Sequence, residues 1–178
     1  MVLLERGTFL GSLDGWLAAA RDGRGCLVLV GGEAGIGKTA LVRAFCDRHD
    51  GDARVLWGAC DALRTPRPLG PLLDITREVG GELARLVAAE PTRHRLFGAF
   101  LDLLAAPGPP VVAVVEDAHW ADEATLDLLV FVGRRVAATP AMVVVTTATT
   151  RSGPGTRCAG SSATWRPRAG CAASSSRR

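Results

Sequence analysis

The sequence predicts an α/β protein in which a mostly parallel sheet lies between two layers of helices. Four near-continuous apolar runs of strand length alternate with segments of helical periodicity. Strands of this kind are typical of a parallel sheet that is covered on both faces. A glycine-rich segment follows the first run and two acids end the third, so candidate functional residues fall at the carboxyl ends of strands.

The individual elements follow from periodicity and from turn signals such as residues 22–25. A proline-rich loop separates the second strand from the helices that come after it. In chain order we predict a helix at Leu10–Ala20, a strand at Cys26–Val30, a helix from Lys38 to about Arg48, a strand at Arg54–Trp57, helices at Leu72–Val79 and Arg93–Leu104, a strand at Val111–Val115, a helix at Glu123–Val136 and a strand at Met142–Thr146.

Length and composition limit the class of protein. A chain of 178 residues is long enough for one α/β domain with a substantial core, and a second full domain is not expected. Hydrophobic residues make up 48% and charged residues 22%, which excludes an intrinsically disordered chain. No apolar stretch approaches the roughly 20 residues of a transmembrane helix, and Glu5 interrupts a signal-peptide pattern. We therefore expect a cytoplasmic protein without a membrane partner.

The net charge of +3 is unevenly divided along the chain. Residues 1–147 carry 15 basic and 18 acidic side chains, whereas residues 148–178 carry six arginines and no acid. The basicity belongs to the C-terminal segment, so it does not indicate a nucleic-acid-binding surface on the domain. Only one of the 21 basic residues is a lysine, Lys38, which indicates a role that a guanidinium does not fill.

Residues 32–39 fit the pattern G-x-x-x-x-G-K-[ST] between a predicted strand and a predicted helix, which indicates a P-loop. Glycines let the backbone turn tightly and aim N–H groups at phosphate oxygens, and the helix N-terminus adds a favourable dipole. Lys38 would reach the β and γ phosphates of ATP. An ordinary glycine-rich turn is the alternative, which the context disfavours. The candidate nucleotide-binding residues are Gly32, Glu33, Ala34, Gly35, Ile36, Gly37, Lys38, Thr39 and Ala40.

The apolar run Val111–Val115 ends in Glu116 and Asp117, which is the form of a Walker B strand. Acids at the carboxyl end of a parallel strand lie beside a P-loop, where one holds the magnesium shell and the other orients an attacking water. We predict Glu116 and Asp117 as catalytic residues, and Thr39 and Glu116 as the Mg²⁺ residues. A strand end that is merely solvated by acids is the alternative.

Three further side chains follow at once, each with two interpretations. His119 either senses the γ-phosphate or hydrogen-bonds within the turn, and we favour the structural role. Trp120 is expected to pack under the loop. Asp122 is expected to cap the next helix at its N-terminus. None of the three is placed among the catalytic residues.

Three motifs together resemble the N-terminal ATPase module of large ATP-binding LuxR-type transcriptional regulators. They are residues 32–39, the segment Gly58–Asp61 with its proline-rich loop at residues 66–71, and Glu116–Asp122, and they agree in order and spacing. This module is of the STAND and AAA-like kind, and the resemblance covers residues 1–147. It implies ATP and Mg²⁺ as cofactors, a nucleotide-controlled switch and self-association through the module. In such regulators a helix-turn-helix DNA-binding domain follows, and we do not expect one within these 178 residues.

The cysteines give no sign of a metal site or of a disulfide framework, because they are odd in number and include no C-x-x-C pair. Buried thiols are therefore the better interpretation. The five are Cys26, Cys46, Cys60, Cys158 and Cys171.

After Thr146 the strand and helix signals end, and residues 148–178 are predicted to be a disordered basic tail. A nucleic-acid-binding arm and a frameshift product are the other interpretations, and we favour the frameshift. Back-translation with GC-rich codons and one base restored after Thr146 yields Tyr-Arg, a charged turn and an amphipathic helix. In that frame an arginine would follow the fourth strand, where Thr147 and Ala148 now stand. The sheet is thus expected to stop after four strands and to leave Cys26–Val30 as an open apolar edge.

The sequence favours an ATP-binding regulatory switch with weak or no ATP hydrolysis. A non-functional truncated fragment of such a regulator is the second interpretation. A small-molecule P-loop kinase is the third, and the absence of a lid-like arginine segment disfavours it.

Overall fold

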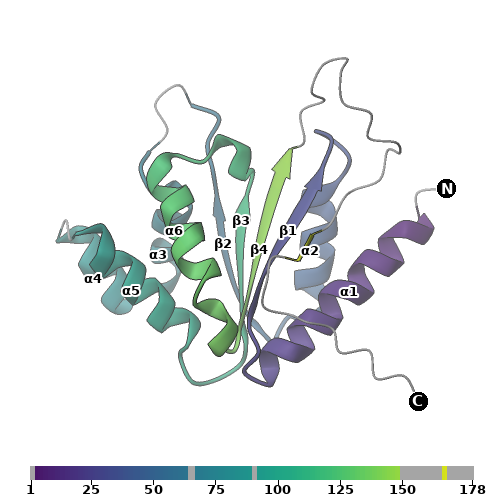
Figure 1. Ribbon diagram of the computed structural model, residues 1–178, viewed down its shortest axis with the longest axis horizontal. Helices are drawn as coiled ribbons and strands as arrows, with labels where there is room; N and C mark the ends of the chain where they lie inside the picture. Colours follow the sequence, from purple (N-terminus) through teal and green to yellow (C-terminus); the bar gives the residue numbers. More distant parts are fainter. Residues whose placement is uncertain (1–2, 64–66, 90–91, 149–165, 168–178) are drawn as a thin grey trace.

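The computed structural model describes residues 3–63, 67–89, 92–148 and 166–167. Its centre is a sheet in the order β2-β3-β4-β1-β5, in which the first four members are parallel neighbours (Figure 1). These strands are β1 (Cys26–Gly32), β2 (Arg54–Ala59), β3 (Val111–Glu116) and β4 (Ala141–Ala148). Because β4 is inserted between β1 and β3, the chain changes winding direction at this place, and the carboxyl ends of three strands meet there.

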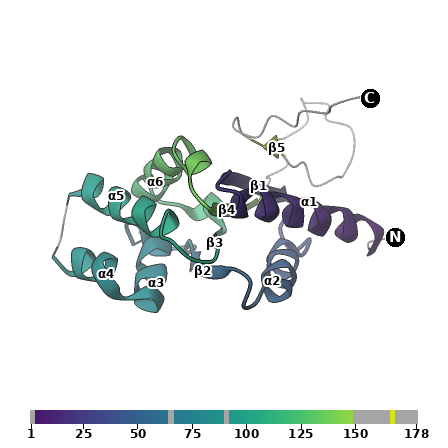
Figure 2. The same ribbon diagram turned by 90° about the horizontal axis from the view of Figure 1, so that it is seen from below.

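Helices cover both faces of the sheet, which confirms the three-layer α/β fold (Figure 2). One layer consists of α1 (Leu3–Arg21) and α2 (Lys38–Arg48). The other consists of α3 (Gly70–Val79), α4 (Gly81–Ala88), α5 (Arg93–Leu104) and α6 (Glu123–Gly133). Two short 3-10 helices, η1 (Ala118–Trp120) and η2 (Val136–Ala138), precede and follow α6.

The strand β3 shows why the apolar runs predicted a buried parallel sheet. Its six residues are all buried. Val111, Ala113 and Val115 belong to the core cluster under α3–α6, whereas Val112 and Val114 belong to the cluster under α1 and α2. Since successive side chains of a strand point to opposite faces, only a run without polar interruption can fill both cores.

Several element boundaries differ from the predictions. Helix α1 begins at Leu3, seven residues before the apolar periodicity does, and its N-terminal turns extend away from the sheet (Figure 1). Residues 5–8, Glu-Arg-Gly-Thr, interrupt the apolar periodicity over those turns, so the sequence did not mark them as helical. Helix α6 ends at Gly133, and η2 begins at the last predicted residue, Val136. Helix α4 was not predicted, because glycines 80 and 81 with positive φ begin it and hide its pattern.

The C-terminal segment contributes one short strand that was not expected. β5 (Arg166–Pro167) pairs antiparallel with β1 at Val28 and Leu29. The expectation of a fully open β1 edge was therefore wrong at this position. The physical reason is that the edge of a strand presents unpaired N–H and C=O groups, which accept an extended segment. The prediction of disorder for the remaining residues after 148 falls outside the described part of the chain.

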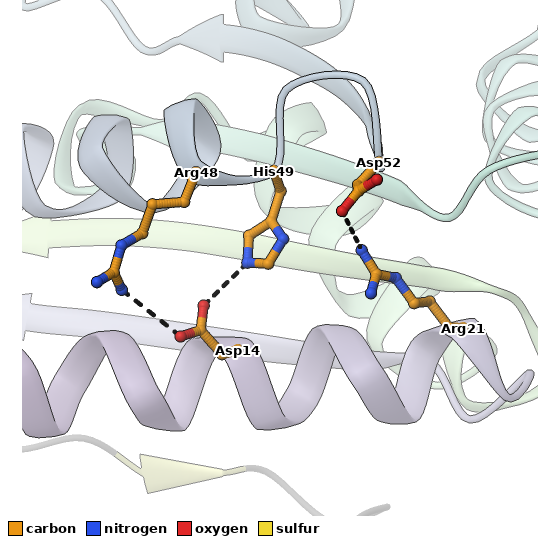
Figure 3. Close-up of polar contacts among 5 residues, drawn as sticks. All are labelled: Asp14, Arg21, Arg48, His49 and Asp52. Atoms are coloured by element: carbon orange, nitrogen blue, oxygen red, sulfur yellow. Dashed lines mark hydrogen bonds and ion pairs between the residues drawn. The ribbon is translucent and has the colours of Figure 1, made fainter.

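Polar contacts fasten α1 to the end of α2 (Figure 3). The Asp14 carboxylate lies 2.9 Å from Nε2 of His49 and 3.6 Å from Nη1 of Arg48. Near the end of α1, Arg21 approaches Asp52 to 3.5 Å. The ion pairs are largely exposed, whereas the His49 ring is mostly buried and tilts against Phe45. These contacts hold the helix that begins at the glycine-rich loop against its neighbour.

Within the residues that the structure describes, no helix is both long and apolar enough to cross a membrane.

Candidate functional site

A cavity of about 530 Å³ opens at the carboxyl ends of β1, β3 and β4. Residues far apart in the sequence line it together: Ala34, Gly35, Gly37, Lys38, Thr39, Ala40, Arg43, Asp117, His119 and Ala148. Six of the nine predicted nucleotide-binding residues are thus brought to one cavity with one predicted catalytic acid. The other three, Gly32, Glu33 and Ile36, do not line it; Ile36 is 51% exposed.

The glycine-rich loop (residues 33–37) connects β1 to α2 and depends on left-handed backbone. Gly35 has a φ of 77° and Gly37, the N-cap of α2, has a φ of 94°. L-residues with a side chain pay for this conformation, so glycine is required by geometry. No side chain caps α2 at its first turn. Its free N–H groups and the positive end of its dipole therefore face the cavity, where an anion is favoured.

The single lysine folds back over the loop. Nζ of Lys38 donates to the carbonyl oxygens of Gly32 and Glu33, each at 3.0 Å. An ammonium group has three N–H donors, so one remains for a ligand. A compact cation beside the N–H groups of a helix N-terminus makes this part of the cavity suited to phosphate.

Asp117 sits directly after β3 in strained backbone. Its φ of 53° and ψ of 44° are left-handed, and among the described non-glycine residues only Leu69 shares a positive φ. Aspartate tolerates this region better than most residues. The hydroxyl of buried Thr146, on β4, accepts the Asp117 N–H at 2.9 Å. The neighbouring strand therefore fixes the conformation in which the Asp117 side chain lines the cavity.

Glu116 is the last residue of β3 and is only 7% exposed. Its Oε2 accepts the indole N–H of Trp57 at 3.0 Å, while its Oε1 is buried and has no hydrogen-bond partner. Glu116 does not line the cavity, in contrast to Asp117. A buried carboxylate oxygen without a partner is costly, so it marks a position where a water or a cation would be stabilised.

The donors at this end of the sheet fit Mg²⁺, the ion that the resemblance implies. No group of three or more His, Cys, Asp or Glu side chains is arranged to hold a metal within the described ranges. Mg²⁺ does not need one, because it keeps several waters and binds through one or two carboxylates and substrate phosphates. The Thr39 hydroxyl, Asp117 and the unpartnered Oε1 of Glu116 supply suitable oxygens.

His119 lines the cavity and makes a structural hydrogen bond, as we favoured. The partner is on β4 and not within the turn of His119 itself. Its Nδ1 accepts the backbone N–H of Ala148, at the end of β4, at 3.3 Å. An accepting Nδ1 assigns the ring proton to Nε2. The same Nδ1 lies 3.9 Å from Oδ1 of Asp117. His119 thus ties η1 to β4 across the mouth of the cavity.

Two structural expectations have opposite outcomes. Asp122 caps α6 as predicted, because its Oδ1 accepts the N–H groups of Ala124 and Thr125 at 2.9 and 3.1 Å. Its other oxygen accepts the Leu69 N–H at 3.1 Å. The prediction that Trp120 packs under the loop was wrong: the side chain is 48% exposed and lies tilted against His119, with 5.1 Å between ring centroids. The short helix η1 turns this ring outward instead of toward the core.

Three residues near the cavity were missed by the sequence reasoning. Arg43 lines the cavity from α2, one and a half turns after Lys38. Trp57 and Thr146 hold Glu116 and Asp117 from neighbouring strands. Helical spacing from Thr39, four residues earlier, could have flagged Arg43, whereas the other two partners depend on strand order, which the sequence does not give.

The described cysteines Cys26, Cys46 and Cys60 form no disulfide bond. Cys46 and Cys60 are buried, as predicted, and burial raises the pKa of each to about 12. For Cys60 the nearby Asp122 and Asp117 carboxylates raise the pKa further in the same direction. The predictions for Cys158 and Cys171 lie outside the described residues.

Comparison with known proteins agrees with this geometry. The family described as AAA ATPase domain matches residues 2–145. The fold is similar to that of PCH-2 from C. elegans, with a TM-score of 0.51 and 13% sequence identity. That similarity covers 83% of this chain and 38% of the PCH-2 chain, so this chain spans well under half of that length. At this identity the likeness concerns the fold alone. A search of curated proteins found no match.

Proposed function

Because residues 2–145 place this chain in the AAA ATPase domain family, we propose that it binds ATP with Mg²⁺ as a nucleotide-dependent regulatory switch in the cytoplasm. The observation that carries the proposal is the cavity of about 530 Å³, where the glycine-rich loop, the start of α2 and Asp117 converge. Its two sides differ in chemistry. One offers backbone N–H groups and a lysine, and the other offers the carboxylate residue Asp117, as a Mg²⁺-nucleotide requires.

The roles of individual residues follow from their positions. Lys38 and the first N–H groups of α2 bind the phosphates. Thr39 and Glu116 hold the Mg²⁺ shell, and bound Mg²⁺ neutralises charge on the phosphates. Asp117 orients the attacking water, because it lines the same cavity as Lys38 and Thr39. Hydrolysis is slow in this proposal, since the only arginine that lines the cavity in the described residues is Arg43, on the same helix as Lys38.

We assign the ATPase domain to residues 1–147, as the module of a LuxR-type transcriptional regulator that self-associates through this domain. We assign residues 148–178 to a frameshift-derived tail. The family match ends at residue 145, just before the change in composition, which supports that boundary. Ala148 lines the cavity, and this is where the other reading frame would place an arginine.

The proposal is tested by the melting temperature of the protein with and without Mg²⁺-ATP. At 100 times the dissociation constant, the ligand stabilises the native state by about 2.7 kcal/mol. For a domain of this size that corresponds to a rise of roughly 5–10 °C. Lys38→Ala should remove most of the rise, because the variant lacks the cation that contacts the phosphates.

Arg85→Ala is the matched control, since it also removes one cation but from an exposed position on α4. This variant should keep the full response to Mg²⁺-ATP. If the wild-type protein and Lys38→Ala respond alike, the assignment of the nucleotide site is wrong.

A further inference from the structure

Glu116 owes its orientation to one side chain of the adjacent strand. The Nε1–H of Trp57, on β2, donates to Oε2 of Glu116 at 3.0 Å. Tryptophan is a donor only, so the contact works in one direction and in one ring orientation. The other carboxylate oxygen, Oε1, is the only buried side-chain atom of this kind left without a hydrogen-bond partner in the described part of the chain. Trp57 thus decides which oxygen is occupied and which is available.

Arg43 links the same indole to the nucleotide cavity. The guanidinium carbon of Arg43 lies 5.6 Å from the centre of the Trp57 ring, within the range of a cation–π interaction. Arg43 comes from α2 and lines the cavity together with Lys38. One cation therefore contacts both the space where phosphates would lie and the ring that holds Glu116.

We propose that Trp57 is a positioning residue for Glu116, and that Arg43 couples this pair to occupancy of the nucleotide cavity. The inference rests on the proposed function, because it takes Mg²⁺-ATP as the ligand. The indole N–H holds Oε2 and leaves Oε1 for the metal's water shell. A partner that orients a metal-binding carboxylate in this way acts on metal affinity without touching the ligand.

Charge explains the part played by Arg43. Its guanidinium is shared between the indole face and the cavity, and the phosphates of ATP are a stronger attraction than a ring quadrupole. Entry of the nucleotide should therefore draw Arg43 away from the ring and change the environment of Trp57. The acid at the end of β3 and the helix after the glycine-rich loop would then respond to the ligand together.

The decisive variant is Trp57→Phe, which keeps an aromatic ring on β2 and removes the N–H donor. Titration with ATP in EDTA and in Mg²⁺ gives two dissociation constants for each protein. The Mg²⁺-dependent gain in affinity should fall about tenfold, because the loss of a partner that orients a metal ligand costs roughly 10- to 100-fold in metal affinity. The dissociation constant in EDTA should stay close to that of the wild type. Trp16→Phe, on α1 against the same core cluster, is the matched control for loss of an indole.

Glu116→Gln in the Trp57→Phe background tests whether the two residues act as one unit. The combined effect on the Mg²⁺-dependent gain should be smaller than the sum of the single effects, because both variants remove the same interaction.

Arg43→Gln tests the second part at an exposed position. ATP affinity should weaken about tenfold through loss of a charge-assisted contact, and the change in tryptophan fluorescence on addition of Mg²⁺-ATP should shrink. Circular dichroism checks the fold of each variant, and if Trp57→Phe does not fold, Arg43→Gln decides the proposal.

The outcomes separate the two levels of inference. Wild-type protein that binds no ATP overturns both the proposed function and this inference. Wild-type protein that binds ATP, with a Trp57→Phe variant of unchanged Mg²⁺ dependence, overturns only the role of Trp57. An unchanged affinity and fluorescence response in Arg43→Gln overturns the coupling through Arg43.

Discussion

The two sides of the cavity are built in different ways. On the side of the glycine-rich loop, Lys38 contacts carbonyl groups only six and five residues earlier in the chain. On the side of the acids, Asp117 depends on Thr146, which is 29 residues away, and Glu116 depends on Trp57, which is 59 residues away. The first side is set by local backbone geometry, and the second by the order of the strands.

Because of this difference, ligand binding can be altered without loss of stability on one side of the cavity but not on the other. Changes in the exposed glycine-rich loop should alter ligand binding with little effect on the core. Changes near Glu116 should disturb packing as well, because β2, β3 and β4 hold the acids in place.

Asp117→Asn should have the largest effect, on turnover rather than on binding. Asparagine tolerates the left-handed backbone as aspartate does, so the variant removes only the carboxylate that accepts a proton from water. ATP turnover should fall by a factor of about 10² or more, and the dissociation constant for ATP should change far less. Steady-state hydrolysis and equilibrium titration measure the two quantities.

Asp102→Asn, at an exposed position on α5, is the control for that substitution and should behave as the wild type. Equal turnover in Asp117→Asn and the wild type would remove Asp117 from the site. A wild-type protein without any turnover would restrict the function to binding.

A matched pair of glycine substitutions compares the stability of the two sides. A Cβ at Gly58, on β2, would lie 2.2 Å from the carbonyl oxygen of Pro71, which is rigid backbone at the start of α3. Gly58→Ala should lower the free energy of unfolding by about 3 kcal/mol. A Cβ at Gly35 meets nothing within 4 Å, so Gly35→Ala should cost about 1 kcal/mol of backbone strain. Urea denaturation measures both, and equal losses would contradict the contrast between the sides.

Ala148→Arg tests whether the end of β4 lacks a phosphate contact. The position lines the cavity, and its backbone N–H already holds His119. A guanidinium at this position should strengthen ATP binding about tenfold through charge-assisted hydrogen bonds. Ala148→Gln is the control of similar polarity without the charge. If the two variants bind ATP with the same affinity, a cation at this position has no phosphate to contact.

The smallest predicted effect concerns alkaline pH and the thiol of Cys60, which lies at the end of β2 beside the acids. Burial, with Asp122 and Asp117 next in effect, raises its pKa from the ordinary value of 9.0 to about 12. A pKa raised by folding contributes stability that is complete below pH 9 and is lost as pH rises toward 12. The free energy of unfolding should therefore fall less steeply above pH 9 in Cys60→Ala than in the wild type. Parallel pH profiles would show that folding does not raise the pKa of this thiol.

Much of the fold was predictable because its signals are local. The strand at Val111–Val115 and the helix at Arg93–Leu104 were predicted almost to the residue, since continuous and periodic apolar patterns report burial directly. The helix cap at Asp122 was predictable for the same reason, because a cap bonds to residues two and three positions later. By contrast, α4 and the outward turn of Trp120 follow from glycine geometry and from the short helix η1.

The sequence by itself determined the glycine-rich loop, its single lysine and the pair of acids, because each is a property of a few neighbouring residues. Only the tertiary structure decided which of them share a cavity. The insertion of β4 between β1 and β3 brings Ala148 and Thr146 to the site. The pairing of β2 with β3 brings Trp57 to Glu116. The other contact of the Trp57 ring is with Arg43, on α2. These contacts join strands that are separated by long crossovers, and no local pattern in the chain encodes which strands become neighbours.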